Sequence, residues 1–574
     1  MRKLQTTPKG YTCDSDKLCS PESTVERVKA LFAGHGGILA ELRRTDTGRL
    51  GIPVYLSICG TQARGVMPTR KQMGKGASPA QAEASALMEL AERFSYFSFW
   101  ADESNFTLAT WSQAQALWPG KVIPIEEIIL SVRDTITPDQ AASLMDLVPW
   151  RFYPATRVQD GQEVMVPLDW FKKLNEFNGS SAGNCLEESI LQGACELVER
   201  HVSAVIDREQ PHLPNIDLVN LDDPVLAGLV DAFKRNGVTL WLKDFSLNMP
   251  VPTVGALAYD PSTLGIRSEI VFTAGTATSP VKAAVRAITE VAQLAGDFET
   301  GSNYEASGLR KFTDLGELGW LAEGPSTSID RLPGIERQDM LDEIGAFCQG
   351  LNAQGYTLYT VETTHKDLGV SANYSFVPGF LFRERTPRAS VALFVGRILA
   401  EESPEDQAAT GLEVLAGACP DAPCLPFFRG LLALRAGDVL DAIELFEKAS
   451  GLQPEQEDEA LALFYQAYSL TQLEQWEEAL PILGKAIGIS PEVKEYHNLR
   501  GVCRFKAGNY ADAAGDFEAA LALDSGSVMD LANLGLCHKF LGHTDAAVTF
   551  LSKALEMDPS LEFARTHLEQ IIPE

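Results

Sequence analysis

Alternating apolar and polar positions occur in six short stretches of the first 400 residues. Such alternation is typical of strands with one buried face. The stretches cover residues 52–59, 164–168, 238–245, 251–258, 268–273 and 356–362. Longer stretches with the apolar spacing of helices lie between them, without a strict strand–helix–strand repeat. This pattern predicts an α+β domain in which helices cover the sheets.

The boundaries of this domain follow from the same pattern. A helical stretch begins just after Ser20 and ends between Gly34 and Gly37, where glycines stop it. Residues 1–20 are polar and lack periodicity, so we expect a poorly ordered N-terminal tail, followed by one domain over residues 21–400. The polar, proline-marked residues 401–424 predict a linker.

Residues 425–574 contain an internal repeat of about 34 residues. Small residues recur in register, at Ala442, Ala479, Ala513 and Ala547 and again at Ala449, Ala486, Ala520 and Ala554. Three of the four units carry a glycine at the expected turn, where the second unit has Glu474. The repeat resembles tetratricopeptide repeats and implies an all-α solenoid of about four units. Such arrays bind peptides or proteins; the alternative is that this one only packs on the first domain or on a second copy.

A helical stretch in the first domain carries evenly spaced acids. It starts near Cys185, directly after the Gly- and Ser-rich turn NGSSAGN at 178–184. At about 100° per residue, one arc of roughly 80° holds Glu188, Gln192, Glu196 and Glu199. Carboxylates on one face repel each other unless a cation lies between them, and a helix N-terminus favours anions. The pattern indicates a metal–nucleotide site; the alternative is a solvated acidic helix face.

Two more stretches have related features. Residues 73–97, MGKGASPAQAEASALMELAERFSYF, place a Gly-rich turn with Lys75 before a helix that carries Glu89 and Glu92. The Lys75 ammonium can reach a nucleotide phosphate as a point charge; the alternative is a surface lysine in a turn, which is the commoner case. The helix of residues 279–294 carries Arg286 and Glu290 one turn apart.

Together these stretches resemble the YcaO family. The resemblance rests on GKG with SALMELAER, on NGSSAGN with ELVER, on the later RAITE, and on RLGIP at 49–53, DLGV at 367–370 and VPG at 377–379. It covers roughly residues 20–400 and implies a fold that binds ATP and Mg²⁺ without a P-loop. In agreement, the chain has no GxxxxGK[ST] motif. The resemblance further implies phosphorylation of a peptide backbone amide oxygen, so that a nucleophile can attack the amide carbon.

The resemblance implies roles for individual residues. The matching positions are Glu89, Glu92, Asn184, Glu188, Glu196, Glu199, Arg200, Arg286 and Glu290, and the turns and helix face add Lys75, Ser181 and Gln192 as nucleotide-binding residues. Arg200 and Arg286 are the expected catalytic residues, because they would neutralise charge on the transferred phosphoryl group. The expected Mg²⁺ ligands are Glu89, Glu92, Glu188, Glu196, Glu199 and Glu290. His201 stands where the family usually has Asp.

The sequence does not identify the attacking nucleophile. Family members use a peptide Cys, Ser or Thr to form azolines, a sulfur donor to form thioamides, or an amine. Azoline-forming members tend to end in a proline-rich tail, whereas this region continues into repeats. The resemblance is therefore to the stand-alone branch, which is linked to an accessory role in methylthiolation of a ribosomal protein. Two alternatives are a ligase or kinase acting on a small molecule, and a nucleotide-switched repeat scaffold without catalysis.

Composition restricts the partners. The sequence contains no run of 18 apolar residues, so no membrane span is predicted. Its ten cysteines are scattered and form no CxxC pair, which indicates a reducing cytoplasm. A net charge of −30 argues against nucleic acid. Residues 401–574 contain 30 acidic and 11 basic residues, a net charge of −19, which indicates either a basic partner or a solubility effect. We expect a peptide or protein substrate, a partner protein bound by the repeats, and a homodimer.

Overall fold

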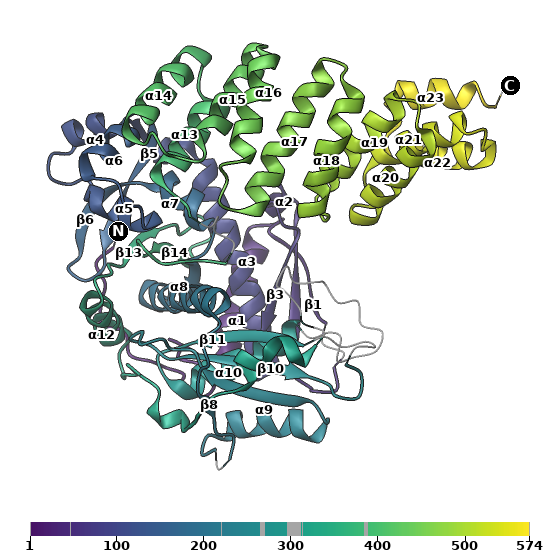
Figure 1. Cartoon of the computed structure of the whole chain (residues 1–574). Coiled ribbons are helices and arrows are strands. Elements are labelled where there is room, and N and C mark those ends of the chain that lie inside the picture. The colour runs from purple at the N-terminus through teal and green to yellow at the C-terminus, as the bar shows by residue number, and fades with distance from the viewer. Residues whose placement is uncertain are drawn as a thin grey trace. The chain divides into compact units, whose positions relative to one another are not determined.

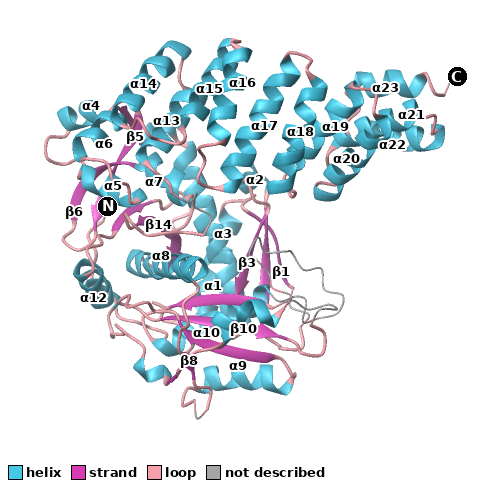
Figure 2. Ribbon diagram, in the orientation of Figure 1, coloured by secondary structure: helices cyan, strands magenta, loops and turns pink. Residues whose placement is uncertain are grey.

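The computed structural model describes residues 2–45, 48–219, 221–264, 270–294, 312, 314–383 and 388–572. The chain forms two compact units (Figure 1). The first contains residues 1–135 and 149–386, and the second contains residues 136–148 and 387–574. All described strands belong to the first unit, and the described elements of the second are helices (Figure 2). This division agrees with the predicted α+β domain followed by an all-α solenoid.

The first unit contains the same order of elements twice. The first copy is α1 (Pro21–Gly34), β1 (Leu39–Arg44), β2 (Val54–Cys59), β3 (Lys71–Lys75) and α3 (Pro79–Ala101), with the short α2 (Thr61–Val66) inserted before β3. The second copy is α9 (Pro224–Arg235), β9 (Thr239–Asp244), β10 (Thr253–Tyr259), β11 (Val271–Thr276) and α10 (Pro280–Leu294). In both copies the three strands pair antiparallel in sequence order. Each copy is therefore a helix, a three-stranded meander and a second helix.

The two copies also share the contact between their last strand and last helix. A Cβ on Gly74, the penultimate residue of β3, would lie 2.0 Å from the Ala86 nitrogen, and one on Gly275 of β11 would lie 2.3 Å from the Ala287 nitrogen. Only glycine allows backbones to approach this closely. A Ser-Pro pair then starts each helix, at residues 78–79 and 279–280. The sequence thus builds the same strand-to-helix junction twice.

A third sheet lies beside these modules. Its order is β4 (Thr107–Ala109), β5 (Trp150–Arg157), β13 (Tyr359–Glu362), β14 (Ser371–Phe376) and β7 (Ser180–Gly183), and β6 (Gln162–Pro167) also pairs with β5. The helices α4 (Trp111–Leu117), α5 (Ile125–Val132) and α7 (Leu168–Asn175) accompany it. The edge strand β7 leads directly into the 24-residue helix α8 (Leu186–Glu209). The second module's sheet is completed by β8 (Asn215–Ile216) and β12 (Ser326–Thr327).

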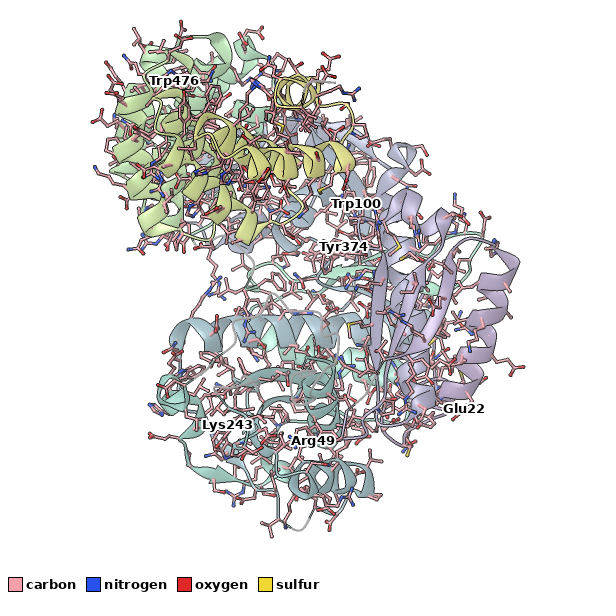
Figure 3. The ribbon with its side chains drawn as sticks, turned by 90° about the vertical axis from the view of Figure 1, so that its right-hand side faces the viewer. Glu22, Arg49, Trp100, Lys243, Tyr374 and Trp476 are labelled. Atoms are coloured by element: carbon pink, nitrogen blue, oxygen red, sulfur yellow. The ribbon has the colours of Figure 1, made fainter. Side chains whose placement is uncertain are left out.

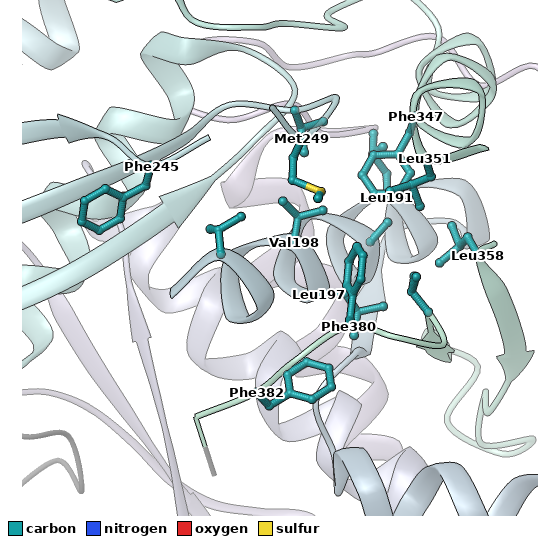
Figure 4. Close-up of a cluster of buried hydrophobic side chains, with 14 of the residues drawn as sticks. Leu191, Leu197, Val198, Phe245, Met249, Phe347, Leu351, Leu358, Phe380 and Phe382 are labelled. Atoms are coloured by element: carbon teal, nitrogen blue, oxygen red, sulfur yellow. The ribbon is translucent and has the colours of Figure 1, made fainter. Parts of the chain in front are cut away.

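Helix α8 lies in a hydrophobic core of the first unit. Its apolar side chains pack with those of α12 (Met340–Ala353) and of residues 377–382 (Figure 4). Leu197 and Val198 of α8 and Phe380 are fully buried. Burial of this kind contributes about 1.5–3 kcal/mol for each large apolar side chain. The acids on the opposite face of α8 therefore project from a firmly held helix.

Aromatic contacts join α3 to the third sheet. The ring of Tyr96 lies 6.2 Å from the Trp100 ring on the same helix and 5.5 Å from the Tyr374 ring of β14, measured between centroids. Trp100 and Tyr374 are labelled in Figure 3. The Tyr96 hydroxyl donates to the Glu176 carbonyl at 2.6 Å, so the buried ring has no unpaired polar tip.

Residues 2–20 lie against the first unit, in place of the predicted poorly ordered tail. Tyr11 and Lys17 pair and close a turn, and Pro8 pairs with Asp339. The Lys9 ammonium is buried and lies 2.6 Å from the Glu343 carboxylate. Sequence periodicity could not show this segment, because tertiary contacts to residues more than 300 positions away hold it in place.

The predicted strands correspond to β2, β6, β9, β10, β11 and β13, with differences of one to three residues at most of their ends. Residues 268 and 269 of one predicted strand lie outside the described residues. The missed strands include β3 (KQMGK), which has no β-branched or aromatic residue, and β7 (SSAG), whose Ser and Gly residues resemble a turn in sequence. Pairing with neighbouring strands makes them extended despite low strand propensity.

The second unit contains more helix than predicted. The helices α6 (Pro138–Met145), α13 (Val391–Glu402) and α14 (Glu405–Ala418) belong to it, so the predicted linker 401–424 is largely helical. Ala408, Leu412 and Leu415 of α14 are buried on one face. A Cβ on Gly411 would lie 2.6 Å from the Leu399 side chain, which shows close packing of α14 on α13.

The repeats consist of antiparallel helix pairs. They are α15 (Leu425–Ala436) with α16 (Val439–Ser450), α17 (Gln456–Gln472) with α18 (Trp476–Ile489), α19 (Lys494–Lys506) with α20 (Tyr510–Leu523) and α21 (Val528–Phe540) with α22 (Thr544–Met557), followed by α23 (Glu562–Glu569). Every alanine of the predicted register is fully buried. Gly437, Gly508 and Gly542 have φ between 79° and 83°, and Glu474 has φ 58° at the same place in the second unit. The alanines of the predicted register therefore lie inside the packed helix pairs.

Among the described residues, no helix has both the length and the apolar character that crossing a membrane requires.

We predict that Gly501→Ala destabilises the third repeat. A Cβ at Gly501 would lie 2.9 Å from the Phe517 ring, so the helices would have to separate, at a cost of about 1–3 kcal/mol. Hydrogen exchange of the α19 and α20 amides in the full chain should accelerate. The control is Gly515→Ala, at an exposed position in α20 with open space around it, which should slow exchange through better helix propensity. Equal protection in both variants would contradict this packing.

Candidate functional site

A cavity of about 380 Å³ lies in the first unit. Residues of the helices α3, α8 and α10 line it together with residues 14–17 of the N-terminal segment. Every predicted site residue except Ser181 lines this cavity: Lys75, Glu89, Glu92, Asn184, Glu188, Gln192, Glu196, Glu199, Arg200, Arg286 and Glu290. The three helices that the sequence identified separately therefore contribute to one site.

Helix α3 places two carboxylates beside an arginine. Arg93 Nη1 lies 3.4 Å from Glu92 Oε1, and Arg93 Nη2 lies 3.9 Å from Glu89 Oε1. The guanidinium also lies 4.1 Å from the centroid of the Phe177 ring. Burial raises the pKa of both Glu89 and Glu92, and the Arg93 charge opposes this rise. The pair is therefore poised to hold an additional positive charge.

The middle of α8 connects to the second module. The Glu199 carboxylate accepts a hydrogen bond from the Thr276 N–H at 2.8 Å, and Gln192 Oε1 accepts one from Arg286 Nη1 at 3.1 Å. Glu196 lies 3.6 Å from Arg200, one turn further along α8. These contacts fix the directions of the two predicted catalytic arginines relative to the acids.

Glu188 lies at the start of α8 and accepts several hydrogen bonds. Its Oε1 accepts the backbone N–H of Asn184 at 3.2 Å and the Asn184 amide at 3.1 Å. Its Oε2 accepts the Leu18 N–H at 2.8 Å, and Lys17 Nζ lies 3.6 Å from Oε1. Glu188 thus joins the helix start to the N-terminal segment.

Lys75 links the first module to the second. It ends β3 and forms an ion pair with Glu290 of α10. Burial lowers the Lys75 pKa to about 8, and the nearby Arg286 charge contributes to this shift. The ammonium therefore titrates close to neutral pH and can respond to an anion in the cavity.

The residues present fit a nucleotide with a divalent cation. The Arg286 Nε–H is buried and has no hydrogen-bond acceptor within the described part of the chain, so an anionic oxygen would satisfy it. Carboxylates are the preferred protein ligands of Mg²⁺. Among the described residues, no three His, Cys, Asp or Glu side chains lie close enough to one another to hold a metal ion in this arrangement. The predicted set of six Mg²⁺ ligands therefore stays a prediction.

Ser181 supports the site from beneath. Its fully buried hydroxyl donates to the Ser189 carbonyl at 2.7 Å and contacts Asn373 Oδ1 at 3.0 Å. A Cβ on Gly193 would lie 2.5 Å from the Ser181 hydroxyl, so this glycine lets α8 approach β7. Residues 180–183 form a strand paired with β14 and not the predicted open turn. The structure thus gives Ser181 a positioning contact where the sequence suggested a nucleotide contact.

His201 fixes the segment that follows β14. Its Nδ1 accepts the Leu381 N–H at 3.0 Å, and its ring stacks on Phe380 with centroids 4.4 Å apart. This segment brings Arg383 to the cavity lining, with its guanidinium 5.0 Å from the Phe272 ring centroid. The residue that departs from the family pattern therefore contacts the chain next to the site and does not itself line the cavity.

The cavity lining also contains charged residues that were not predicted as site residues, among them Asp16, Lys17, Arg93, Lys282 and Arg383. The sequence pattern could have indicated two of them. Lys282 lies one helical turn before Arg286, and Arg93 directly follows Glu92. The other three lie in segments without periodicity, so only the tertiary structure identifies them.

The chain belongs to the YcaO family, because the family model described as a YcaO cyclodehydratase that binds ATP and Mg²⁺ matches residues 73–381. The cofactors of this family are thus the ATP and Mg²⁺ that the sequence predicted. Tetratricopeptide-repeat models match residues 427–493, 466–528 and 531–561. The protein is therefore a YcaO-family chain with C-terminal tetratricopeptide repeats.

Individual relatives agree with this classification. An uncharacterized protein of Methanothermobacter thermautotrophicus is 27% identical over 357 residues, which cover 58% of this chain and 87% of that protein. The ribosomal protein S12 methylthiotransferase accessory factor YcaO of Escherichia coli is 28% identical over 210 residues, 33% of this chain and 35% of that protein. A heterocyclase structure in complex with substrate and cofactor has a TM-score of 0.53 at 21% identity, covering 71% of this chain and 58% of that chain. This structural similarity shows that the two chains share a fold.

We predict that affinity for an ATP analogue with Mg²⁺ falls as the pH rises through about 8. Without bound nucleotide the Lys75 ammonium has a pKa of about 8, and only its protonated form attracts phosphate. Affinity for the analogue should be at its maximum below this pH and decline by up to about tenfold per pH unit above it. Calorimetry between neutral and alkaline pH measures this change. Lys75→Arg should remove the dependence, and a wild-type affinity that stays constant would contradict it.

We also predict that Ser181→Ala lowers stability without weakening nucleotide binding. The change deletes hydrogen bonds within a buried network, at a cost of about 1–3 kcal/mol. Because Ser181 does not line the cavity, the dissociation constant of the ATP analogue should stay within about twofold of wild type. Chemical denaturation and calorimetry measure the two effects separately. Loss of binding with unchanged stability would restore Ser181 as a nucleotide contact.

Proposed function

We propose that this protein uses ATP and Mg²⁺ to activate a backbone amide of a peptide or protein for attack by a nucleophile. The supporting observation is the convergence of acids from α3, α8 and α10, together with Arg200 and Arg286, on one cavity. An amide carbon is a poor electrophile and its oxygen a poor leaving group, so the reaction requires this kind of activation. The family description supports the same class of reaction.

When bound, ATP would supply the phosphoryl group that activates the amide oxygen, with ADP as the leaving group. The nucleophile would bond to the amide carbon, and that oxygen would leave as part of phosphate together with the C–O electron pair. Glu89, Glu196 and Glu290 would hold Mg²⁺ from three different helices. Arg200 and Arg286 would stabilise the negative charge that develops on phosphoryl oxygens. Gln192 orients Arg286 through its hydrogen bond, so the guanidinium is held in place before substrate arrives.

The finer chemistry is thioamide- or azoline-type modification, or an accessory role in methylthiolation of a ribosomal protein. The name of the Escherichia coli relative supports the last of these. The repeats would contribute a binding surface for the substrate protein or for a partner that delivers sulfur. Their acidic residues favour a basic partner, and ribosomal proteins are of this kind.

The test uses ribosomal protein S12 peptides whose backbone amides carry a heavy-oxygen label. Wild-type protein with ATP, Mg²⁺ and sulfide should release ADP, and the label should appear in phosphate because the amide oxygen leaves with it. Mass spectrometry of phosphate and peptide measures both products. Glu196→Gln should lower turnover on the order of a hundredfold or more.

Three results would contradict the proposal. Unlabelled phosphate would mean that the amide oxygen is never phosphorylated. ADP release with small amines or acids, but not with peptides, would favour a ligase or kinase. Tight ATP binding without turnover on any peptide would favour a nucleotide-switched scaffold.

A further inference from the structure

The N-terminal wall of the cavity, residues 14–17, comes from the segment that sequence periodicity did not identify. Its side chains Asp14, Ser15, Asp16 and Lys17 line the cavity. The wall is one arm of a tight turn, in which the Lys17 N–H donates to the Tyr11 carbonyl and the Tyr11 N–H donates to the Lys17 carbonyl, both at 3.0 Å. The wall is therefore a defined piece of backbone whose position depends on what holds the turn.

A network of charged side chains around Asp16 holds the turn. Lys9 Nζ lies 2.9 Å from Asp16 Oδ2 and 2.6 Å from Glu343 Oε1. Lys282 Nζ lies 2.5 Å from Asp16 Oδ1 and 2.6 Å from Glu336 Oε1. Asp16 is the one residue that contacts both lysines in these pairs. It therefore joins the turn to α10 and, through Lys9, to α12.

Burial makes this network stronger than a surface ion pair. The side chains of Lys9 and Glu343 are at most 2% exposed, and those of Asp16 and Lys282 at most 10%. Exposed ion pairs contribute about 0–1 kcal/mol, whereas breaking a buried pair costs several kcal/mol. The Thr278 hydroxyl also donates to Asp16 Oδ2 at 3.2 Å. These contacts fix the carboxylate of Asp16 in one orientation.

The residues next to Asp16 contact the start of α8. The Leu18 N–H donates to Glu188 Oε2 at 2.8 Å, and Lys17 Nζ lies 3.6 Å from Glu188 Oε1. Because Asp16, Lys17 and Leu18 are consecutive, a shift of Asp16 by an ångström moves the Lys17 ammonium and the Leu18 N–H by a similar amount. The position of Asp16 thus controls both contacts with Glu188.

We propose that Asp16 is a positioning residue of the site: by bridging Lys9 and Lys282 it holds Lys17 and the Leu18 N–H against Glu188, and so completes the cavity wall before nucleotide binds. Asp16 acts through its neighbours and does not itself take part in the chemistry. The inference uses the proposed role of the cavity as the nucleotide site.

The network also shows which substitution is informative. After Asp16→Asn, Lys9 still pairs with Glu343 and Lys282 still pairs with Glu336, so neither lysine becomes an unpaired buried charge. The change removes the charge of the bridge and leaves the side-chain volume unchanged. We therefore expect the variant to fold, with a melting temperature below that of wild type because its two ion pairs with Asp16 are lost.

The experiment combines calorimetry with hydrogen exchange on the full chain, using a non-hydrolysable ATP analogue with Mg²⁺ as the probe. Asp16→Asn should weaken binding of the analogue by on the order of tenfold to a hundredfold. The amides of Gly10, Tyr11, Lys17 and Leu18 should exchange faster in the free variant, and saturating analogue should restore much of their protection. In turnover, KM for ATP should rise while kcat stays close to wild type, because the reacting groups are unchanged.

Matched variants separate positioning from general stability. Arg2→Gln removes an exposed ion pair with Glu362 in the same segment and should change neither binding nor exchange at Leu18. Asp16→Glu keeps the carboxylate and should recover part of the affinity. Should Asp16→Asn fail to fold, Thr278→Val removes only one hydrogen bond to Asp16 and should give a smaller loss in the same direction.

Wild-type affinity in Asp16→Asn, or weaker binding with unchanged exchange at residues 10–18, would overturn the inference. Its failure is distinguishable from that of the proposed function. If wild-type protein binds the analogue but never activates an amide, the binding and exchange effects of Asp16 still hold. If wild-type protein does not bind the analogue at all, both proposals fail together.

Discussion

Repulsion among carboxylates is the constraint on which the site depends. Three helices direct acids into one cavity, and each acid is held beside a basic side chain or an N–H donor. Glu290 faces Lys75 and Glu92 faces Arg93, so pairs form both within one module and between the two modules. Without these partners the carboxylates would repel one another or take up protons, and burial already raises the pKa of Glu89 and Glu92.

The site could be predicted from the sequence wherever its residues lie on regular helices. Helical spacing placed Glu188, Gln192, Glu196 and Glu199 on one face, and all four line the cavity. Periodicity fails where the backbone is irregular, so the N-terminal segment and Arg383 were not found. Ser181 shows a different limit: a Gly- and Ser-rich stretch has the composition of a phosphate-binding turn, but pairing with β14 makes it an edge strand.

The fold of the second unit was more accessible, because a solenoid repeats the same local contacts. Each alanine of the register is buried where two helices cross, so a single unit predicts the next. The segment 401–424 was harder to interpret. Its prolines and acids indicate a linker, while Ala408, Leu412 and Leu415 form the narrow buried face of α14. A short amphipathic stripe among many polar residues gives a weak signal until its partner helix is known.

The duplicated module has a consequence for the direction in which a substrate crosses the cavity. Glu89 and Glu290 each lie 15 residues after the close-approach glycine of their module, at Gly74 and Gly275. The cations do not follow this equivalence: Arg286 corresponds to Ser85 in the first copy, and Lys75 corresponds to a threonine in the second. Two modules with the same order of elements therefore carry an unsymmetrical set of charges. An elongated anion that binds there has one preferred orientation, although the two modules around it are similar.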